Sequence, residues 1–210
     1  MVWTELASTL LGVGVLTVIT VVVLATFGVA RSWESPLAIA RGAVQLAVIS
    51  VILTGIISSP VWVAVALVVM YRIASAVATG RLGWSWAHAG MMGASIAAGV
   101  LTATIVVFAT HALDFTPRYA LAIGAIIIGN AMSIATLAGR QFTGLLDNHW
   151  DEVEGWLAIG ATPRQSTIAL ARRAVRDALI PSIDQTKTTG LVVLPGAFVG
   201  AIFGGISDRK

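Results

Sequence analysis

The residues best suited to chemistry with another molecule lie in one polar segment, residues 152–163. Glu152 and Glu154 offer carboxylates that can pair with basic groups of a partner protein, and Gly160 lets the chain turn sharply. This pattern predicts a short projecting helix that returns after Gly160, a shape that suits binding rather than catalysis. An ordinary surface hairpin would satisfy the same pattern. The residues that we expect to contact a partner are Glu152, Glu154, Leu157, Gly160, Ala161, Thr162 and Pro163.

A second set of polar or helix-breaking residues lies within or beside long apolar runs. Gln45 and Asn130 need hydrogen-bond partners there, and either interhelical bonds or a polar path through a membrane would supply them. Asp184 and Lys187 are three positions apart, so on a helix they share a face and can pair. Pro195 and Gly196 would break a helix, which suits either dense packing or a hinge. The candidate pathway or gating residues are Arg41, Gln45, Asn130, Ser133, Asp184, Lys187, Pro195 and Gly196.

Catalytic patterns are absent from the sequence. It contains no G-x-x-x-x-G-K-[ST] segment, so it has no phosphate-binding loop for ATP. It has no cysteine, which excludes disulfides and thiolate metal sites. His88, His111 and His149 fall in three separate loops or helix ends and form no clustered metal pattern. We therefore expect neither an enzyme nor a cofactor bound by this chain, and the sequence leaves any metal site unknown.

The composition shows which elements must position these residues. Of the 210 residues, 57% are hydrophobic and only 11% are charged, and the mean hydropathy is +0.90. A soluble domain carries roughly 25% charged residues, so a lipid bilayer is the expected solvent for most of this chain. The net charge is +3, and the basic residues lie mostly in the late part of the chain, which favours a membrane explanation over nucleic-acid binding.

Six apolar runs approach or reach the roughly 20 residues that a membrane-spanning helix needs. They are continuous and do not alternate, which excludes strands. The first has no preceding Lys or Arg, so we expect a retained helix rather than a signal peptide. The sequence thus predicts one all-α membrane domain over residues 1–210. Its predicted spans are residues 6–29, 37–57, 61–78, 91–110, 119–138 and 190–206.

The placement of Lys and Arg predicts the orientation. These residues gather between Arg140 and Lys187, so this block belongs in the cytoplasm. Counting back through the spans puts the N-terminus outside. Every basic loop except the turn that contains Arg118 then falls on the cytoplasmic side.

The cytoplasmic region, about residues 139–187, holds about half of the charged residues in the chain. It predicts a helix over residues 151–159, a turn at Gly160, and a second helix that starts at Thr162 and Pro163. We expect Pro181 to end or kink this second helix. Its predicted apolar side is Ile168, Ala171, Val175, Ala178 and Leu179, and its basic side is Arg172, Arg173 and Arg176.

The segment from Glu154 to Gly160 resembles the E-A-A-x-x-x-G coupling loop in permease subunits of ATP-binding-cassette (ABC) transporters. Three further stretches, residues 41–46, 129–133 and 181–197, occur in the order found in one family. With them, the chain resembles the FetB-type (YbbM) iron-export permeases, a family that is also similar to plant aluminium-tolerance permease subunits. The resemblance runs from about residue 41 to residue 205.

The resemblance implies a permease in the inner membrane of a bacterium, as a homodimer driven by a separate ATPase subunit that binds ATP and magnesium. It also implies export of a metal ion such as iron. Two departures stand out. Ser133 occupies a position where the family commonly has Asn, and the family usually continues into a final transmembrane helix that we expect this chain to lack.

Two other functions stay open at this point. A self-contained carrier or channel, driven by an ion gradient, would need acidic residues within its spans, and none lies in the middle of a predicted span. A membrane scaffold without transport is the other alternative. The substrate and the direction of transport do not follow from the sequence.

Overall fold

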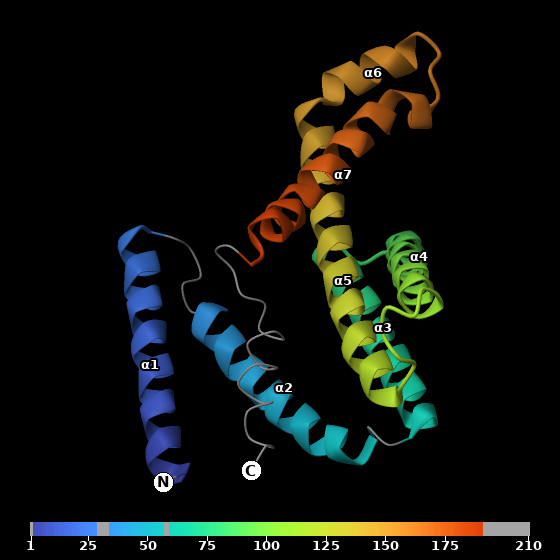
Figure 1. Cartoon of the computed structure of the whole chain (residues 1–210). Coiled ribbons are helices and arrows are strands. Elements are labelled where there is room, and N and C mark those ends of the chain that lie inside the picture. Colours follow the sequence, from blue (N-terminus) through green and yellow to red (C-terminus); the bar gives the residue numbers. More distant parts are fainter. Residues whose placement is uncertain (1, 29–33, 57–58, 191–210) are drawn as a thin grey trace. The chain divides into compact units, whose positions relative to one another are not determined.

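The computed structural model describes residues 2–28, 34–56 and 59–190. Within these ranges the regular elements are seven α-helices (Figure 1). The chain divides into two compact units, Met1–Ser59 and Pro60–Lys210. The predicted all-helical class is confirmed for the described residues.

The first unit contains α1 (Val2–Thr26) and α2 (Glu34–Ile56), which contact each other. They correspond to the predicted segments 6–29 and 37–57. Thr17 and Thr20 of α1 donate their hydroxyl protons to the carbonyls of Val13 and Leu16, at 2.7 and 2.9 Å. These internal bonds let hydroxyl groups lie in an apolar helix without needing water.

The second unit is built on α3 (Pro60–Arg81), α4 (Trp86–Ala109) and α5 (Pro117–Asn148), each of which packs against the other two. Pro60 starts α3, and the side chains of Ser85 and Thr116 cap α4 and α5. All three helices are long and apolar enough to cross a membrane, whereas the apolar stretch Leu11–Thr26 in α1 is shorter. The membrane character is thereby supported, and the six spans and their orientation stay predictions.

Small residues bring these helices close together. A Cβ atom at Gly124 of α5 would lie 2.6 Å from a methyl carbon of Leu67, so only hydrogen fits beside that leucine as it is placed. Tyr71 of α3 donates its hydroxyl proton to the carbonyl of Gly93 in α4, at 3.0 Å. Close approach at glycine and hydrogen bonds between helices are how helices associate where the surroundings are apolar.

Helix α5 is longer than predicted, because it continues past residue 138 to Asn148. Its 32 residues measure about 48 Å, whereas the hydrocarbon core of a bilayer is about 30 Å thick. The predicted span ended at residue 138 because polar residues begin there. The backbone hydrogen bonds of a helix can nevertheless continue from the apolar layer into water. One end of α5 must therefore project out of the apolar layer.

The projecting end of α5 leads into α6 (Trp150–Ala158) and α7 (Pro163–Thr188), and α7 packs back along α5 (Figure 1). Of the two outcomes predicted at Pro181, an end of the second helix is contradicted, because α7 continues to Thr188, and a kink stays a prediction. The carbonyl that loses its partner is that of Asp177, four residues earlier, and this residue is partly exposed, so water can hydrate it. The predicted sixth span, apart from its first residue, Gly190, lies outside the described residues.

Candidate functional site

The candidate site is the hairpin formed by α6 and α7, and its geometry begins at His149. This residue ends α5 and starts α6, so the two helices are joined by one residue. Its backbone N–H donates to the carbonyls of Leu145 and Leu146, at 3.1 and 3.3 Å, and its Nδ1 lies 2.9 Å from the oxygen of Leu145. The long helix α5 therefore changes direction into α6 without a flexible linker.

The far end of α6 is closed by backbone hydrogen bonds. The N–H of Ala161 donates to the carbonyl of Trp156 and the N–H of Gly160 to that of Leu157, both at 3.0 Å. Gly160 has a φ of +93°, a conformation that side-chain-bearing residues rarely adopt. This pair of bonds around a left-handed glycine is a Schellman motif. The predicted cap and turn at Gly160 are confirmed.

Helix α7 begins with a second local motif, and its N-cap, Thr162, lies two residues after Gly160. Thr162 accepts a hydrogen bond from the backbone N–H of Gln165 at 3.3 Å, while the Gln165 side chain accepts one from the N–H of Thr162 at 2.8 Å. This reciprocal pair is a capping box, and Pro163 occupies the first turn. With both helix ends capped, little freedom is left in the tip. The predicted start of the helix is confirmed, but the role of Gln165, visible as T-x-x-Q, was missed.

The tip of the hairpin exposes large apolar side chains. Trp156 is 49% exposed and Ile159 is 75% exposed, and Leu157 beside them is also exposed. Trp156 and Ile159, together with Gly160, Ala161 and Gln165, line a hollow of about 360 Å³. A cluster of exposed apolar residues at the end of a polar hairpin is typical of a surface that binds another protein. We call Trp156, Leu157, Ile159, Gly160 and Ala161 the tip cluster.

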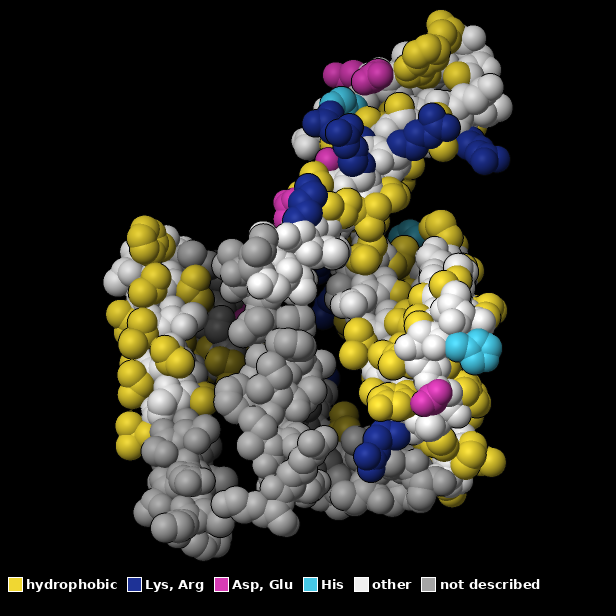
Figure 2. Space-filling view, in the orientation of Figure 1, with side chains coloured by type: hydrophobic (Ala, Val, Ile, Leu, Met, Phe, Trp, Pro, Cys, Tyr) yellow, Lys and Arg dark blue, Asp and Glu magenta, His cyan; other side chains and the backbone are white. Residues whose placement is uncertain are grey.

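Opposite charges border the tip cluster (Figure 2). Asp151, Glu152 and Glu154 are exposed on α6, and the first two lie in its first turn, where the helix dipole favours acids. Within the described ranges, neither Glu152 nor Glu154 forms an ion pair. Both carboxylates are therefore available to a partner. The exposed basic residues of α7 include Arg164, Arg172, Arg173 and Arg176.

The face by which α7 packs is not the predicted one. Its buried residues are Ser166, Leu170, Ala174 and Ala178, whereas Ile168 and Val175 are exposed. The buried positions recur every four residues and are mostly small, which lets α7 lie close to α5. The predicted apolar side, with Ile168 and Val175, is therefore not the side that packs, because the close contact uses smaller residues. Ala178 was assigned correctly.

The predicted pathway residues are distributed over both units. Arg41 and Gln45 are exposed on α2 of the first unit, one helical turn apart. Asn130 and Ser133 are exposed on one side of α5, and Ser133 donates its hydroxyl proton to the carbonyl of Gly129 at 2.9 Å. Asn130 makes no side-chain hydrogen bond to the described part of the chain. Pro195 and Gly196 lie outside the described residues.

Asp184 and Lys187 lie in the last turns of α7, where the Lys187 Nζ is 3.4 Å from the Asp184 Oδ1. The predicted pairing is confirmed. Both side chains are more than half exposed, and an exposed pair of this kind contributes little, about 0–1 kcal/mol. Among the described residues, no group of three or more His, Asp or Glu side chains could hold a metal ion.

Comparison with known proteins gives a consistent set of relatives. A family model described as an uncharacterised protein family, UPF0014, matches residues 7–209. The UPF0014 membrane protein STAR2 of Oryza sativa subsp. japonica is 35% identical over 175 residues, which cover 82% of this chain and 61% of STAR2. The protein ALUMINUM SENSITIVE 3 of Arabidopsis thaliana is 33% identical over 174 residues, which cover 82% of this chain and 64% of that protein.

A bacterial relative is also similar. The probable iron export permease protein FetB of Escherichia coli K12 is 34% identical over 116 residues, which cover 55% of this chain and 44% of FetB. No solved structure matches the chain. The chain spans less than two thirds of the length of the plant relatives.

Proposed function

The chain belongs to the UPF0014 family of membrane proteins, the FetB-type family, and from this premise we propose that it is the permease subunit of an ABC transporter. A separate cytoplasmic ATPase subunit that binds ATP and magnesium would supply the energy for transport. Its cargo would be a metal ion exported from a bacterial cell, with iron the first candidate because a relative is named as an iron export permease.

The observation that carries this proposal is the hairpin tip. A rigid turn, closed by the bonds around Gly160 and by the Thr162 cap, presents Trp156 and Ile159 as exposed side chains. Glu152 and Glu154 stand beside them with exposed carboxylates. An apolar centre with a charged border is what a protein-binding surface requires, and an ATPase groove with basic residues at its edge would complement it.

The packing of α7 supports a mechanical role for the hairpin. Ser166, Leu170 and Ala174 of α7 are buried where this helix runs along α5. Helix α5 is continuous from Pro117 to Asn148 and reaches from the hairpin into the apolar bundle. Because closely packed helices move as units, a displacement of the tip would tilt α5. ATP-driven closure of two ATPase subunits would move two such hairpins together, so we propose a homodimer of permease chains.

The polar face of α5 is the proposed lining of the transport path. Asn130 and Ser133 are exposed on a helix whose neighbourhood is apolar, and exposure of an amide to lipid is unfavourable. An aqueous path between two permease chains would hydrate them. Arg41 and Gln45 are the candidate pathway residues of the first unit. Amide and hydroxyl oxygens suit a hard cation or its complex.

The test is co-purification of the full-length permease with a candidate ATPase, followed by measurement of ATP hydrolysis in vesicles with and without the permease. The variants Glu154→Gln and Gly160→Ala should reduce both association and stimulation, whereas Asp147→Asn, a change of an exposed acid on α5, should not. Association that survives both hairpin changes would refute the docking role of the tip. Metal ion flux in vesicles that contain no ATPase would instead favour a self-contained carrier.

A further inference from the structure

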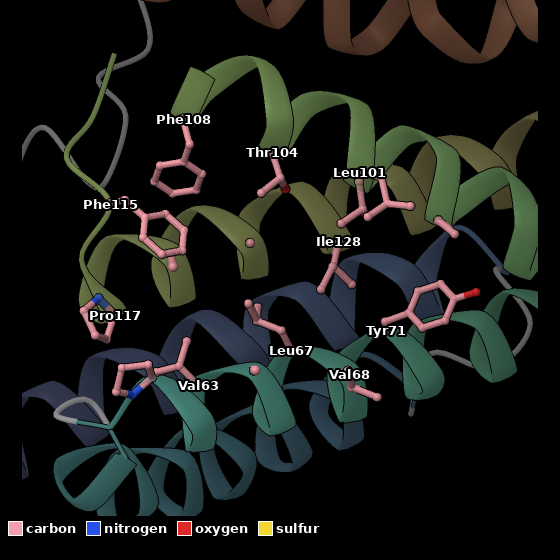
Figure 3. Close-up of a pocket in the computed structure, with 16 residues that line it drawn as sticks. Val63, Leu67, Val68, Tyr71, Leu101, Thr104, Phe108, Phe115, Pro117 and Ile128 are labelled. Carbon is pink, nitrogen blue, oxygen red and sulfur yellow. The ribbon is translucent and has the colours of Figure 1, made fainter. Parts of the chain in front are cut away.

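An apolar groove of about 620 Å³ lies between α3, α4 and α5, away from the hairpin (Figure 3). Val63, Leu67 and Ile128 point into it from α3 and α5, and Leu101 lines it from α4. The hydroxyl groups on its wall belong to Tyr71 and Thr104, and that of Tyr71 already donates to Gly93. A groove so poor in polar groups does not hold ordered water, so its natural occupant is a hydrocarbon.

The groove has the length and position of one leaflet of a bilayer. It extends along α3 from Pro60 to Tyr71, about 16 Å at the rise of a helix, which is about half of a 30 Å hydrocarbon core. Pro60 starts α3 and Pro117 starts α5, and Phe108 lies near the end of α4. All three line the groove, so one end of it lies at the membrane surface and the other near the midplane.

The groove is open along its side. Val68 and Leu101 line it and are nonetheless 60% and 61% exposed. Both side chains are apolar, so this open side suits lipid rather than water, and an acyl chain can enter laterally from the bilayer. Phe108 and Phe115, whose rings meet edge to face at 5.0 Å between centroids, form the wall at the surface end (Figure 3).

An exposed positive charge stands at the surface end of the groove. Arg118 directly follows Pro117, is exposed, and forms no ion pair within the described ranges. It lies in the basic turn that breaks the charge pattern of the other loops. A guanidinium group at the level of the head groups is well suited to bind a phosphate in bidentate fashion. Asp114, in the same turn, is the nearby acid in sequence, and no ion pair joins it to Arg118 in the described ranges.

We propose that this groove binds one acyl chain of an anionic phospholipid, with the phosphate of the lipid held by Arg118. The apolar wall selects the hydrocarbon, the length of the groove confines it to one leaflet, and the charge of Arg118 selects an acidic head group. The lipid fills the space between three helices that the described side chains leave open. This site is independent of the hairpin and of any ATPase.

The experiment uses the full-length protein in vesicles of phosphatidylcholine with phosphatidylglycerol that carries a photoreactive group on one acyl chain. Illumination should label peptides that contain Leu67, Leu101 or Ile128. The variant Ala120→Phe fills the groove from α5 and should reduce this labelling about tenfold, whereas Ala122→Phe, a change at an exposed position on α5 that does not line the groove, should leave it unchanged.

A second arm tests the head group. We expect Arg118→Gln to abolish most of the preference for labelled phosphatidylglycerol over labelled phosphatidylcholine, a loss of about tenfold that is typical of one charge-assisted hydrogen bond. Arg81→Gln, an exposed change at the other end of α3, is the matched control. If Ala120→Phe leaves the labelling unchanged, the groove is not the binding site. If both lipids label the wild-type protein equally, Arg118 does not select the head group. Crosslinks from the groove to a second permease chain would assign it to a protein contact and also overturn the proposal.

Discussion

The backbone N–H of Ala161 donates to the carbonyl of Trp156 at 3.0 Å, across the turn at the end of α6. Ala161 is the first residue after the turn, and Trp156 carries one of the exposed side chains of the tip cluster. The position of the Trp156 backbone is therefore fixed by the turn. Changes that disturb the backbone of the turn should move the tip cluster even when they remove no tip side chain.

Replacement of Gly160 by Ala tests this link. The φ of +93° strains any residue with a side chain, by about 1–2 kcal/mol, although a Cβ at this position would meet no atom within 4 Å. We expect lower affinity for the ATPase and a small drop in melting temperature. The measurement is ATPase binding to the permease in vesicles, with thermal unfolding of the same sample.

Gly155→Ala is the matched control for this change. Gly155 is also on α6, and a Cβ added there would also meet no atom within 4 Å, but its φ is not positive. Alanine should stabilise the helix there by about 1 kcal/mol or leave it unchanged. Equal effects of the two substitutions on ATPase binding would contradict the role of the Gly160 turn.

Truncation of the tip side chains should weaken docking without unfolding the chain. Trp156→Ala and Ile159→Ala remove exposed groups, so we expect the melting temperature to stay within about two degrees of the wild-type value. If Trp156 is a docking residue, its loss should cost about 2 kcal/mol, roughly thirtyfold in affinity for the ATPase. Trp86→Ala, a change of an exposed tryptophan at the start of α4, should have no effect on binding. Unchanged affinity for both tip variants would assign docking to another surface.

The charge of Glu154 should act on the rate of association and on its salt dependence. Glu154→Gln keeps the shape of the side chain and removes the carboxylate, so we expect several-fold slower ATPase association at low salt. The difference from wild type should shrink as salt is raised, because surface charges are screened. Stopped-flow mixing at two salt concentrations measures both effects. A salt-independent difference would indicate a change of structure rather than of charge.

The hairpin was the most predictable part of the molecule because its signals are local. A glycine after a short helix, followed by Thr162 and Pro163, predicts both the turn and the next helix start, and the structure has both. Leu157, Gly160 and Ala161 of the tip cluster were singled out, whereas Trp156 and Ile159 were not, since an exposed tryptophan cannot be told from a buried one by sequence alone. Trp156 and Ile159, two large apolar residues close to acids in a polar segment, were the available signal.

The face of α7 and the length of α5 were not predictable for a different reason. Which side of α7 is buried depends on how close α5 can come, so Ala174 is buried while the larger Val175 is exposed. Hydropathy likewise indicates which part of α5 lies in apolar surroundings, but it does not indicate where the backbone hydrogen bonds of the helix end. These bonds continue to Asn148. Both features depend on contacts between distant segments, and one sequence does not record such contacts.

The contact between α7 and α5 gives the sharpest test of the mechanical role, because it can be disturbed far from the tip. Ala174 is 1% exposed on the packed side of α7, so Ala174→Leu should push α7 away from α5 and cost about 1–3 kcal/mol. Val175→Leu changes the neighbouring exposed residue and should cost nothing. We expect Ala174→Leu to keep ATPase binding, since the tip cluster is intact, while ATP-driven iron flux in vesicles falls severalfold. Loss of binding together with flux would mean that the substitution unfolds the hairpin, and full flux in a folded variant would show that α7 does not transmit motion to α5.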